Sequence, residues 1–225
     1  MTESPPLDLV ALVPGTDEEQ IVHALLSKRR ESLQMRPVQY EILKHPRRDS
    51  GCAREAVQLL QPYLRRSAHA LVMFDHFGSG AEASPADQLA AAVRQDLERS
   101  GWKDRAEVIV PSPELEVWVW SDSPHVDVGL GWRDHKPPLR DWLRRNGFWN
   151  ETESKPADPT KAFEAALRQV HIKHSGSIFR DLAEKVGLER CTDREFLRLC
   201  RTLKSWFPPT SGDRREAEAA EDRPS

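Results

Sequence analysis

The 225-residue sequence has little cysteine and no long hydrophobic run. Its three cysteines, Cys52, Cys191 and Cys200, are widely spaced and form no Cys-x-x-Cys pair. An odd, scattered set argues for reduced thiols and against a disulfide framework or a zinc knuckle. No apolar run approaches the roughly 18 residues of a membrane span, and the N-terminus lacks the basic and apolar regions of a signal peptide. We therefore expect a soluble, cytoplasmic protein that does not act at a membrane.

The common phosphate-binding motifs are also missing. The chain contains neither G-x-x-x-x-G-K-[ST] nor a G-x-G-x-x-G after an expected strand, which argues against P-loop and dinucleotide-binding proteins. The triplet Gly78-Ser79-Gly80 does not match the nucleophile elbow of a hydrolase, because the spacing fails and no helix follows directly.

Charge is unevenly distributed, although the net charge is only −3. Residues 1–130 contain 14 Lys/Arg and 20 Asp/Glu, whereas residues 131–210 contain 16 and 11. An acidic first part beside a basic second part suggests a different partner for each. Two ordinary solvated surfaces would give the same counts, so charge alone does not decide between these interpretations.

Strand and helix patterns alternate through the first half of the chain. Apolar or alternating runs predict strands at 7–15, 37–45, 70–73 and 108–110. Helical spacing predicts helices from Thr16 onward, at 54–66 with a kink or an early end at Pro62, and at 85–100. This order builds a mostly parallel sheet covered by helices, so we predict an α/β fold.

The second half of the chain reads as helical. Apolar spacing predicts helices at 138–146, 159–170, 176–187 and 193–205. Residues 208–225 lack aromatic and large apolar side chains, which is typical of a disordered tail. We therefore expect an α/β domain at 1–130, a helical basic region at 131–208 and a disordered tail at 209–225.

The stretch HALVMFDHFGSG (69–80) ends an expected buried strand on Asp75 and His76. Parallel sheets bind ligands beyond the carboxyl ends of their strands, at a point where strand order reverses. Asp75 would face this crevice, and Gly78 and Gly80 would let a phosphate or a metal approach the backbone closely. Alternatively, Asp75 is a turn residue that hydrogen-bonds local amides. The spacing fits both interpretations.

A second acidic cluster follows the fourth expected strand, in PSPELEVWVW (111–120). Glu114 and Glu116 come just past the strand end. The segment could continue as a strand, but proline followed by glutamate equally suits a helix start. We expect Trp118 and Trp120 to lie in the core rather than to form a base-stacking platform.

Two further groups are weaker candidates. His171 and His174 have the spacing of metal ligands on a helix, but they lack a third ligand, and we expect them to contact solvent or nucleic acid. Cations with nearby Trp142 and Trp149 suit a phosphate backbone and stacked bases; they are Arg133, Lys136, Arg140, Arg144 and Arg145. A solvated amphipathic helix with inward tryptophans is an equally good interpretation.

Three short motifs now occur in a recognisable order: strand–PGTDEEQ–helix, then LVMFDHFG, then PELEVW. This order resembles the TOPRIM-like proteins of bacterial defence loci, of the RloB type or a related TOPRIM-like family, over about residues 7–122. Such proteins show V-E-G-x-T-E, D-x-D and P-x-F-E-x-W motifs. The residues that match are Val13, Gly15, Glu18, Asp75, Pro113, Glu116 and Trp118.

The sequence departs from the family pattern at two acidic positions. Pro14 stands where the family has an acid/base or metal-binding glutamate, and Phe77 replaces the second aspartate of D-x-D. A two-metal phosphodiester cleavage would therefore lack ligands. The resemblance implies that Asp75 and Glu116 bind Mg²⁺ or Mn²⁺, and that Glu18 or His76 moves protons.

The resemblance implies a component of a bacterial anti-phage defence system that acts on nucleic acid as a metal-dependent nuclease. The alternative, motivated by Pro14 and Phe77, is a catalytically degenerate subunit that binds a defence partner, such as an ATPase or a methyltransferase, or nucleic acid without cleaving it.

Overall fold

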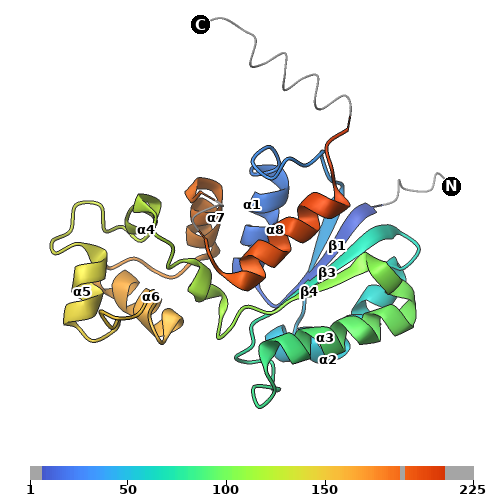
Figure 1. The fold of residues 1–225 in the computed structure, drawn as a ribbon, viewed down its shortest axis with the longest axis horizontal. Helices are drawn as coiled ribbons and strands as arrows, with labels where there is room; N and C mark the ends of the chain where they lie inside the picture. Colours follow the sequence, from blue (N-terminus) through green and yellow to red (C-terminus); the bar gives the residue numbers. More distant parts are fainter. Residues whose placement is uncertain (1–6, 188–190, 211–225) are drawn as a thin grey trace, which may run out of the picture.

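The described part of the chain folds around a parallel β-sheet (Figure 1). The computed structural model describes residues 7–187 and 191–210. In this part the strand order is β2-β1-β3-β4, and all neighbours pair in parallel. The strands are β1 (Leu7–Val13), β2 (Tyr40–Lys44), β3 (Ser67–Met73) and β4 (Ala106–Ile109). The predicted α/β fold with a parallel sheet is confirmed, and most of the tail predicted at 209–225 lies outside the described residues.

Helices cover both faces of the sheet because the central strands are apolar on both sides. In β1, Leu9, Ala11 and Val13 belong to one hydrophobic cluster, whereas Val10 and Leu12 belong to another. Successive side chains of a strand point to opposite faces, so a run without polar residues needs cover on both. This explains why β1 reads as a continuous apolar run.

Each face is covered by its own set of helices. Figure 1 shows α1 (Thr16–Ser27) and α8 (Arg194–Trp206) on one side of the sheet, with α2 (Arg48–Leu60) and α3 (Ala86–Leu97) on the other. Helix α7 (Gly176–Lys185) packs against α1.

The C-terminal part adds short helices that extend beyond the strands. They are α4 (Pro124–Gly129), α5 (Leu139–Arg145) and α6 (Pro159–Gln169). Aspartates cap the starts of two helices: Asp158 accepts from the Lys161 amide at α6, and Asp193 accepts from two amides at α8. Single-turn helices are η1 (Gln61–Tyr63), η2 (Glu98–Trp102), η3 (Lys103–Arg105) and η4 (Leu115–Trp118). The helices predicted at 138–146, 159–170, 176–187 and 193–205 are therefore present.

Two details differ from the sequence prediction. Helix α2 begins at Arg48 rather than Arg54, because its first turn has no apolar residue to mark it, although it ends before Pro62 as expected. His171 and His174 lie between α6 and α7 rather than on a helix. The segment left open as strand or helix, which holds Glu116, forms the single turn η4.

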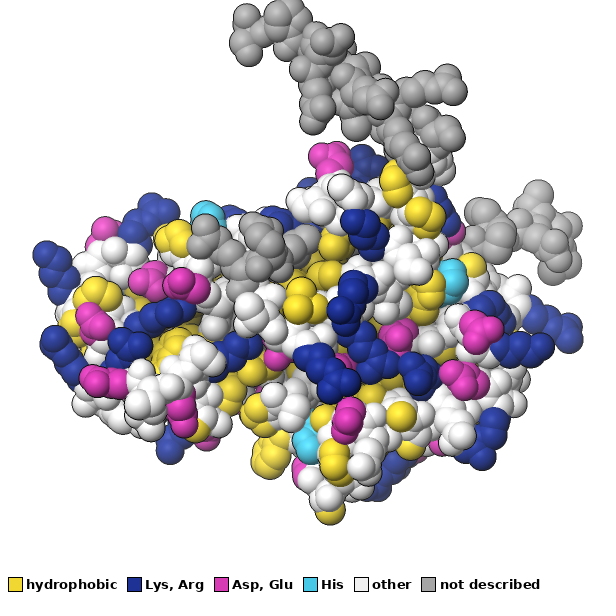
Figure 2. Space-filling view, in the orientation of Figure 1, with side chains coloured by type: hydrophobic (Ala, Val, Ile, Leu, Met, Phe, Trp, Pro, Cys, Tyr) yellow, Lys and Arg dark blue, Asp and Glu magenta, His cyan; other side chains and the backbone are white. Residues whose placement is uncertain are grey.

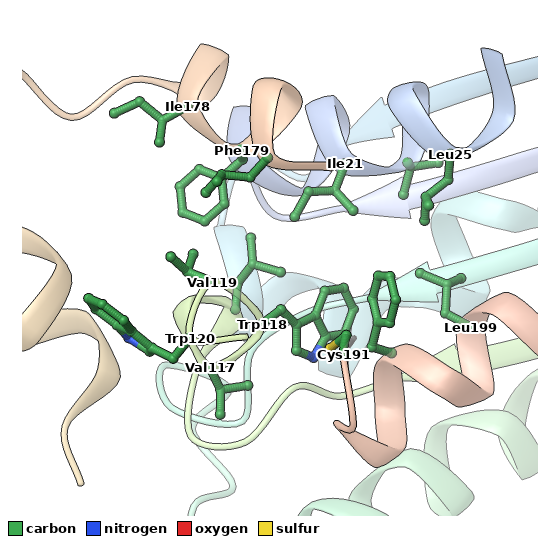
Figure 3. Packing of buried hydrophobic residues seen from close by; sticks show 14 of the residues in the cluster. Ile21, Leu25, Val117, Trp118, Val119, Trp120, Ile178, Phe179, Cys191 and Leu199 are labelled. Carbon is green, nitrogen blue, oxygen red and sulfur yellow. The ribbon is translucent and has the colours of Figure 1, made fainter. Parts of the chain in front are cut away.

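The hydrophobic cluster that contains Leu9, Ala11 and Val13 joins the sheet to the C-terminal helices. Figure 3 shows Trp118 between α1, which carries Ile21 and Leu25, and α8, which carries Leu199. The Trp118 and Phe196 ring centroids are 5.2 Å apart. Trp118 and Trp120 are both buried, so their predicted place in the core is confirmed. The cluster is thus continuous across residue 130, where the sequence suggested a boundary.

None of the helices within residues 7–187 and 191–210 has the length and apolarity needed to cross a bilayer.

Candidate functional site

The strand order reverses between β1 and β3, and acidic side chains gather at that point. From β1 the chain crosses to one side of the sheet, to β2, whereas β3 and β4 lie on the other. The loops that follow β1 and β3 therefore diverge, and this reversal point at the carboxyl ends, here termed the crevice, is where parallel sheets bind ligands. Glu18 follows β1, and Asp75 follows β3.

Asp75 is fixed by two hydrogen bonds to separate segments. Its Oδ1 accepts from the backbone amide of Leu115 at 2.9 Å, and its own amide donates to Asp49 Oδ1 at 2.9 Å. Asp75 therefore does hydrogen-bond an amide, as the turn interpretation required. That amide belongs to η4, however, so the bond joins the β3 loop to the segment that carries Glu114 and Glu116.

Glu18 lies in the first turn of α1 and is 5 % exposed. Its Oε2 is buried and has no hydrogen-bond partner in the described structure. A Cβ atom added to Gly15 would lie 3.3 Å from this oxygen, so glycine at 15 leaves room for the carboxylate. An unpartnered buried carboxylate oxygen costs free energy, and such groups call for an explanation.

Glu114 and Glu116 present a second pair of carboxylates at the same edge. The Thr160 hydroxyl on α6 lies 2.5 Å from Glu114 Oε2 and 3.1 Å from Glu116 Oε2. One hydroxyl has one proton, so it cannot donate to both oxygens at once. The C-terminal region thus contributes a polar contact to the acidic site.

Burial and mutual repulsion raise the pKa values of these acids. Burial is the largest cause for Glu18, whose pKa rises to about 7, and Asp49, Asp17 and Glu116 add repulsion. Burial also raises the pKa of Asp75 well above its ordinary value, and the charges of Glu18 and Asp49 raise it further. The pKa values of Asp49 and Glu116 are raised mainly by burial. The crevice therefore disfavours the negative charge that its own residues would carry at neutral pH.

Cationic groups lie at the rim of this acidic cluster. If a Cβ atom were added to Gly15, the Arg48 guanidinium would lie 3.5 Å from it, so Arg48 is close to the start of α1. The positive charge of Arg48 also lowers the pKa of Asp49 and so opposes the effect of burial. His174 Nε2 lies 2.9 Å from Asp17 Oδ2, and this hydrogen bond is the main cause of the raised pKa of His174. His174 thus joins the α6–α7 loop to α1. His171, the other histidine of the predicted metal-ligand spacing, is exposed in the same loop.

The loop after Asp75 is held by its own contacts. His76 Nε2 lies 2.8 Å from the Ser84 carbonyl oxygen, so this ring nitrogen is engaged in a hydrogen bond within the loop. The amides of Gly78 and Gly80, both at positive φ, donate to Glu82 Oε1. These amides are therefore satisfied within the loop, whereas the Phe77 side chain is 64 % exposed.

The basic residues lie apart from the acids, around α5. Arg133, Lys136, Arg144 and Arg145 are exposed. Arg140 donates to the Ser121 carbonyl oxygen at 2.9 Å, and its guanidinium carbon lies over the Trp149 ring, 5.1 Å from the ring centroid. Trp149 is buried and Trp142 is partly buried against the hydrophobic core, so both tryptophans face inward, as the solvated-helix interpretation expected. Figure 2 shows dark-blue side chains at the α5 end of this face interspersed with magenta ones.

The structure brings Glu18, Asp75 and Glu116 to one edge of the sheet and adds Asp49 and Glu114 to them. Asp49 was missed, although its position a few residues after the predicted strand at 37–45 places it at this edge. Within the described ranges, no three His, Cys, Asp or Glu side chains are already disposed as metal ligands. The acids are neighbours, but their oxygens do not converge on one point.

Comparison of the chain with protein-family models, curated proteins and solved structures gives no match in any of the three. Function is therefore inferred from the site itself.

The raised pKa of Glu18 predicts a pH-dependent stability. A carboxyl with a higher pKa in the folded protein stabilises it at low pH, and this contribution is lost as the pH rises through the folded pKa. The free energy of unfolding should fall between about pH 4.5 and pH 7, by roughly 3 kcal/mol for Glu18 alone. In urea denaturation, Glu18→Gln should flatten this slope. Glu31→Gln, at an exposed site, should keep the wild-type slope; a full slope in Glu18→Gln contradicts the assignment.

Proposed function

We propose that this protein cleaves phosphodiester bonds in nucleic acid with the help of a divalent cation bound at the acidic crevice. The observation that carries the proposal is the meeting of Glu18, Asp75 and Glu116 at the reversal of strand order, with one buried Glu18 oxygen left without a partner. A cation would offset the burial and the mutual repulsion that raise the pKa values of these groups.

The donor set suits Mg²⁺ or Mn²⁺. Both ions take carboxylate oxygens, and Mg²⁺ in particular retains waters and needs only one or two protein carboxylates. Asp75 and Glu116 would hold the ion, each through a carboxylate oxygen other than the one that accepts from Leu115 or Thr160. A bound ion would polarise a phosphoryl oxygen and lower the pKa of water.

Glu18 is the group suited to move a proton. A general acid or base works best when its pKa lies near the working pH, and the pKa of Glu18 is raised to about 7. His76 is less suited, because a ring nitrogen faces the Ser84 carbonyl oxygen. We assign the proton transfer to Glu18 and leave His76 a role in holding the loop.

The resemblance to TOPRIM-like proteins of defence loci supports the same chemistry. Gly15, Glu18, Asp75, Pro113, Glu116 and Trp118 match that pattern in sequence. In the structure Glu18, Asp75 and Glu116 share one edge, as a common site requires. A role in anti-phage defence rests on this resemblance alone, and with it a cytoplasmic place of action.

A second candidate is a degenerate subunit that binds a defence ATPase or methyltransferase. The exposed Phe77 favours it, because an apolar ring stands where the resemblance leads us to expect an acid. Co-purification with the products of neighbouring genes would support this candidate. A monodisperse, partnerless protein with cation-dependent cleavage would contradict it.

The nuclease proposal predicts that cleavage of labelled single- and double-stranded DNA or RNA requires Mn²⁺ or Mg²⁺. Asp75→Asn and Glu116→Gln should each lower the rate at least about a hundredfold, while both variants keep their hydrogen-bond acceptors. Asp104→Asn, at an exposed turn, should cleave at the wild-type rate. Cleavage that persists in EDTA, or in Asp75→Asn, contradicts the proposal.

The basic segment around α5 is proposed to contact the phosphate backbone. Each lysine or arginine contact to phosphate adds about one to the slope of log K against log salt. The double variant Arg144→Ala/Arg145→Ala should therefore bind more weakly and reduce the slope by up to about 2. Arg65→Ala/Arg66→Ala removes an equally exposed adjacent pair and should leave the slope unchanged. A flat salt response of the wild type excludes backbone contacts.

A further inference from the structure

Asp49 shares the crevice with Glu18 and Asp75, although it comes from a third segment of the chain. It lies in the first turn of α2, which follows β2. Its Oδ1 accepts the Asp75 amide at 2.9 Å, so the carboxylate is directly beside the end of β3. The other oxygen, Oδ2, would be 3.5 Å from a Cβ atom on Gly78, so the group lies between α2 and the β3 loop.

The hydrogen bond from the Asp75 amide explains why an acceptor stands at position 49, but it does not explain why that acceptor is a charged carboxylate. An amide acceptor at this position requires one oxygen, which asparagine or serine would supply without a charge. The backbone amide of Asp49 itself also hydrogen-bonds this carboxyl, and the charge of Asp49 repels both Glu18 and Asp75. A charge that destabilises its neighbours, in a half-buried place, indicates a ligand of opposite charge.

The neighbouring Glu18 points to the same ligand independently. Glu18 is nearly fully buried, and its Oε2 has no partner in the described structure. Arg48 is exposed, and its Nη2 would lie 3.5 Å from the same Cβ atom added to Gly15 that would lie 3.3 Å from Glu18 Oε2. Acidic side chains from α1, α2 and the β3 loop are thus neighbours, and Arg48 beside them leaves the buried Glu18 oxygen without a hydrogen bond.

We propose that Asp49 is a third ligand of the divalent cation, joining Asp75 and Glu116, with Glu18 facing the same ion. The inference rests on the proposed function, because it requires a cation in the crevice. It makes α2 part of the site and assigns to Asp49 the place that Phe77 leaves without a carboxylate. Hard, oxygen-preferring ions such as Mg²⁺ and Mn²⁺ are the expected class.

Calorimetric titration with MnCl₂ at pH 7.5 tests this inference on purified full-length protein. The decisive variant is Asp49→Asn, which keeps an acceptor for the Asp75 amide and removes the anionic ligand. Asp87→Asn is the matched control, because Asp87 also lies in the first turn of a helix on this side of the sheet but is exposed. Circular dichroism confirms that each variant is folded, and Asp49→Ser replaces Asp49→Asn if the latter is not.

The expected result is at least about tenfold weaker Mn²⁺ binding by Asp49→Asn, with Asp87→Asn within about twofold of the wild type. If Asp49 only positions Asp75, Asp49→Asn binds as the wild type does, while Asp75→Asn loses binding. That outcome overturns this inference and leaves the proposed cation site in place. Absence of Mn²⁺ binding by the wild type overturns both.

Discussion

The burial of mutually repelling carboxylates at one edge of the sheet is the constraint on which the rest of this structure depends. Glu18, Asp75 and Glu116 are drawn together by parallel strands whose loops diverge at the reversal of order. Their negative charges are poorly solvated, and burial dominates every raised pKa among them. Hydrogen bonds from Leu115 and Thr160 hold the acids in place without neutralising them. A fold that tolerates this cost is expected to recover it by binding a cation.

The helical C-terminal region contributes to the same site. Thr160 on α6 contacts Glu116, and the α6–α7 loop reaches Asp17 through His174. Trp118, which follows Glu116 by two residues, packs within the core shared with α8. The acidic edge of the sheet is thus supported from both parts of the chain. A substitution of Thr160 or His174 would therefore change the contacts that position the acids.

The sequence was informative wherever apolar patterns were strong. The strands at β1 and β3 were predictable because both of their faces are buried, and α6 and α8 because their apolar spacing is regular. Apolar spacing did not mark the helix start beside Asp49, because the first turn of α2 contains no apolar residue, although the position of Asp49 after the predicted strand at 37–45 indicated this edge. The neighbourhood of Glu18, Asp75 and Glu116 followed from their positions after parallel strands. The unpartnered Glu18 oxygen and the role of His76 in its own loop required the coordinates.

Proton release on cation binding tests the central claim most directly. Calorimetric titration with Mn²⁺ in two buffers of different ionisation enthalpy gives the number of protons released per ion. Because the pKa of Glu18 is raised to about 7, this group retains its proton at about pH 6 and loses it as the ion binds. The account predicts net proton release at about pH 6 that diminishes by about pH 8.5. Binding without proton release at both pH values, or no binding at all, would contradict it.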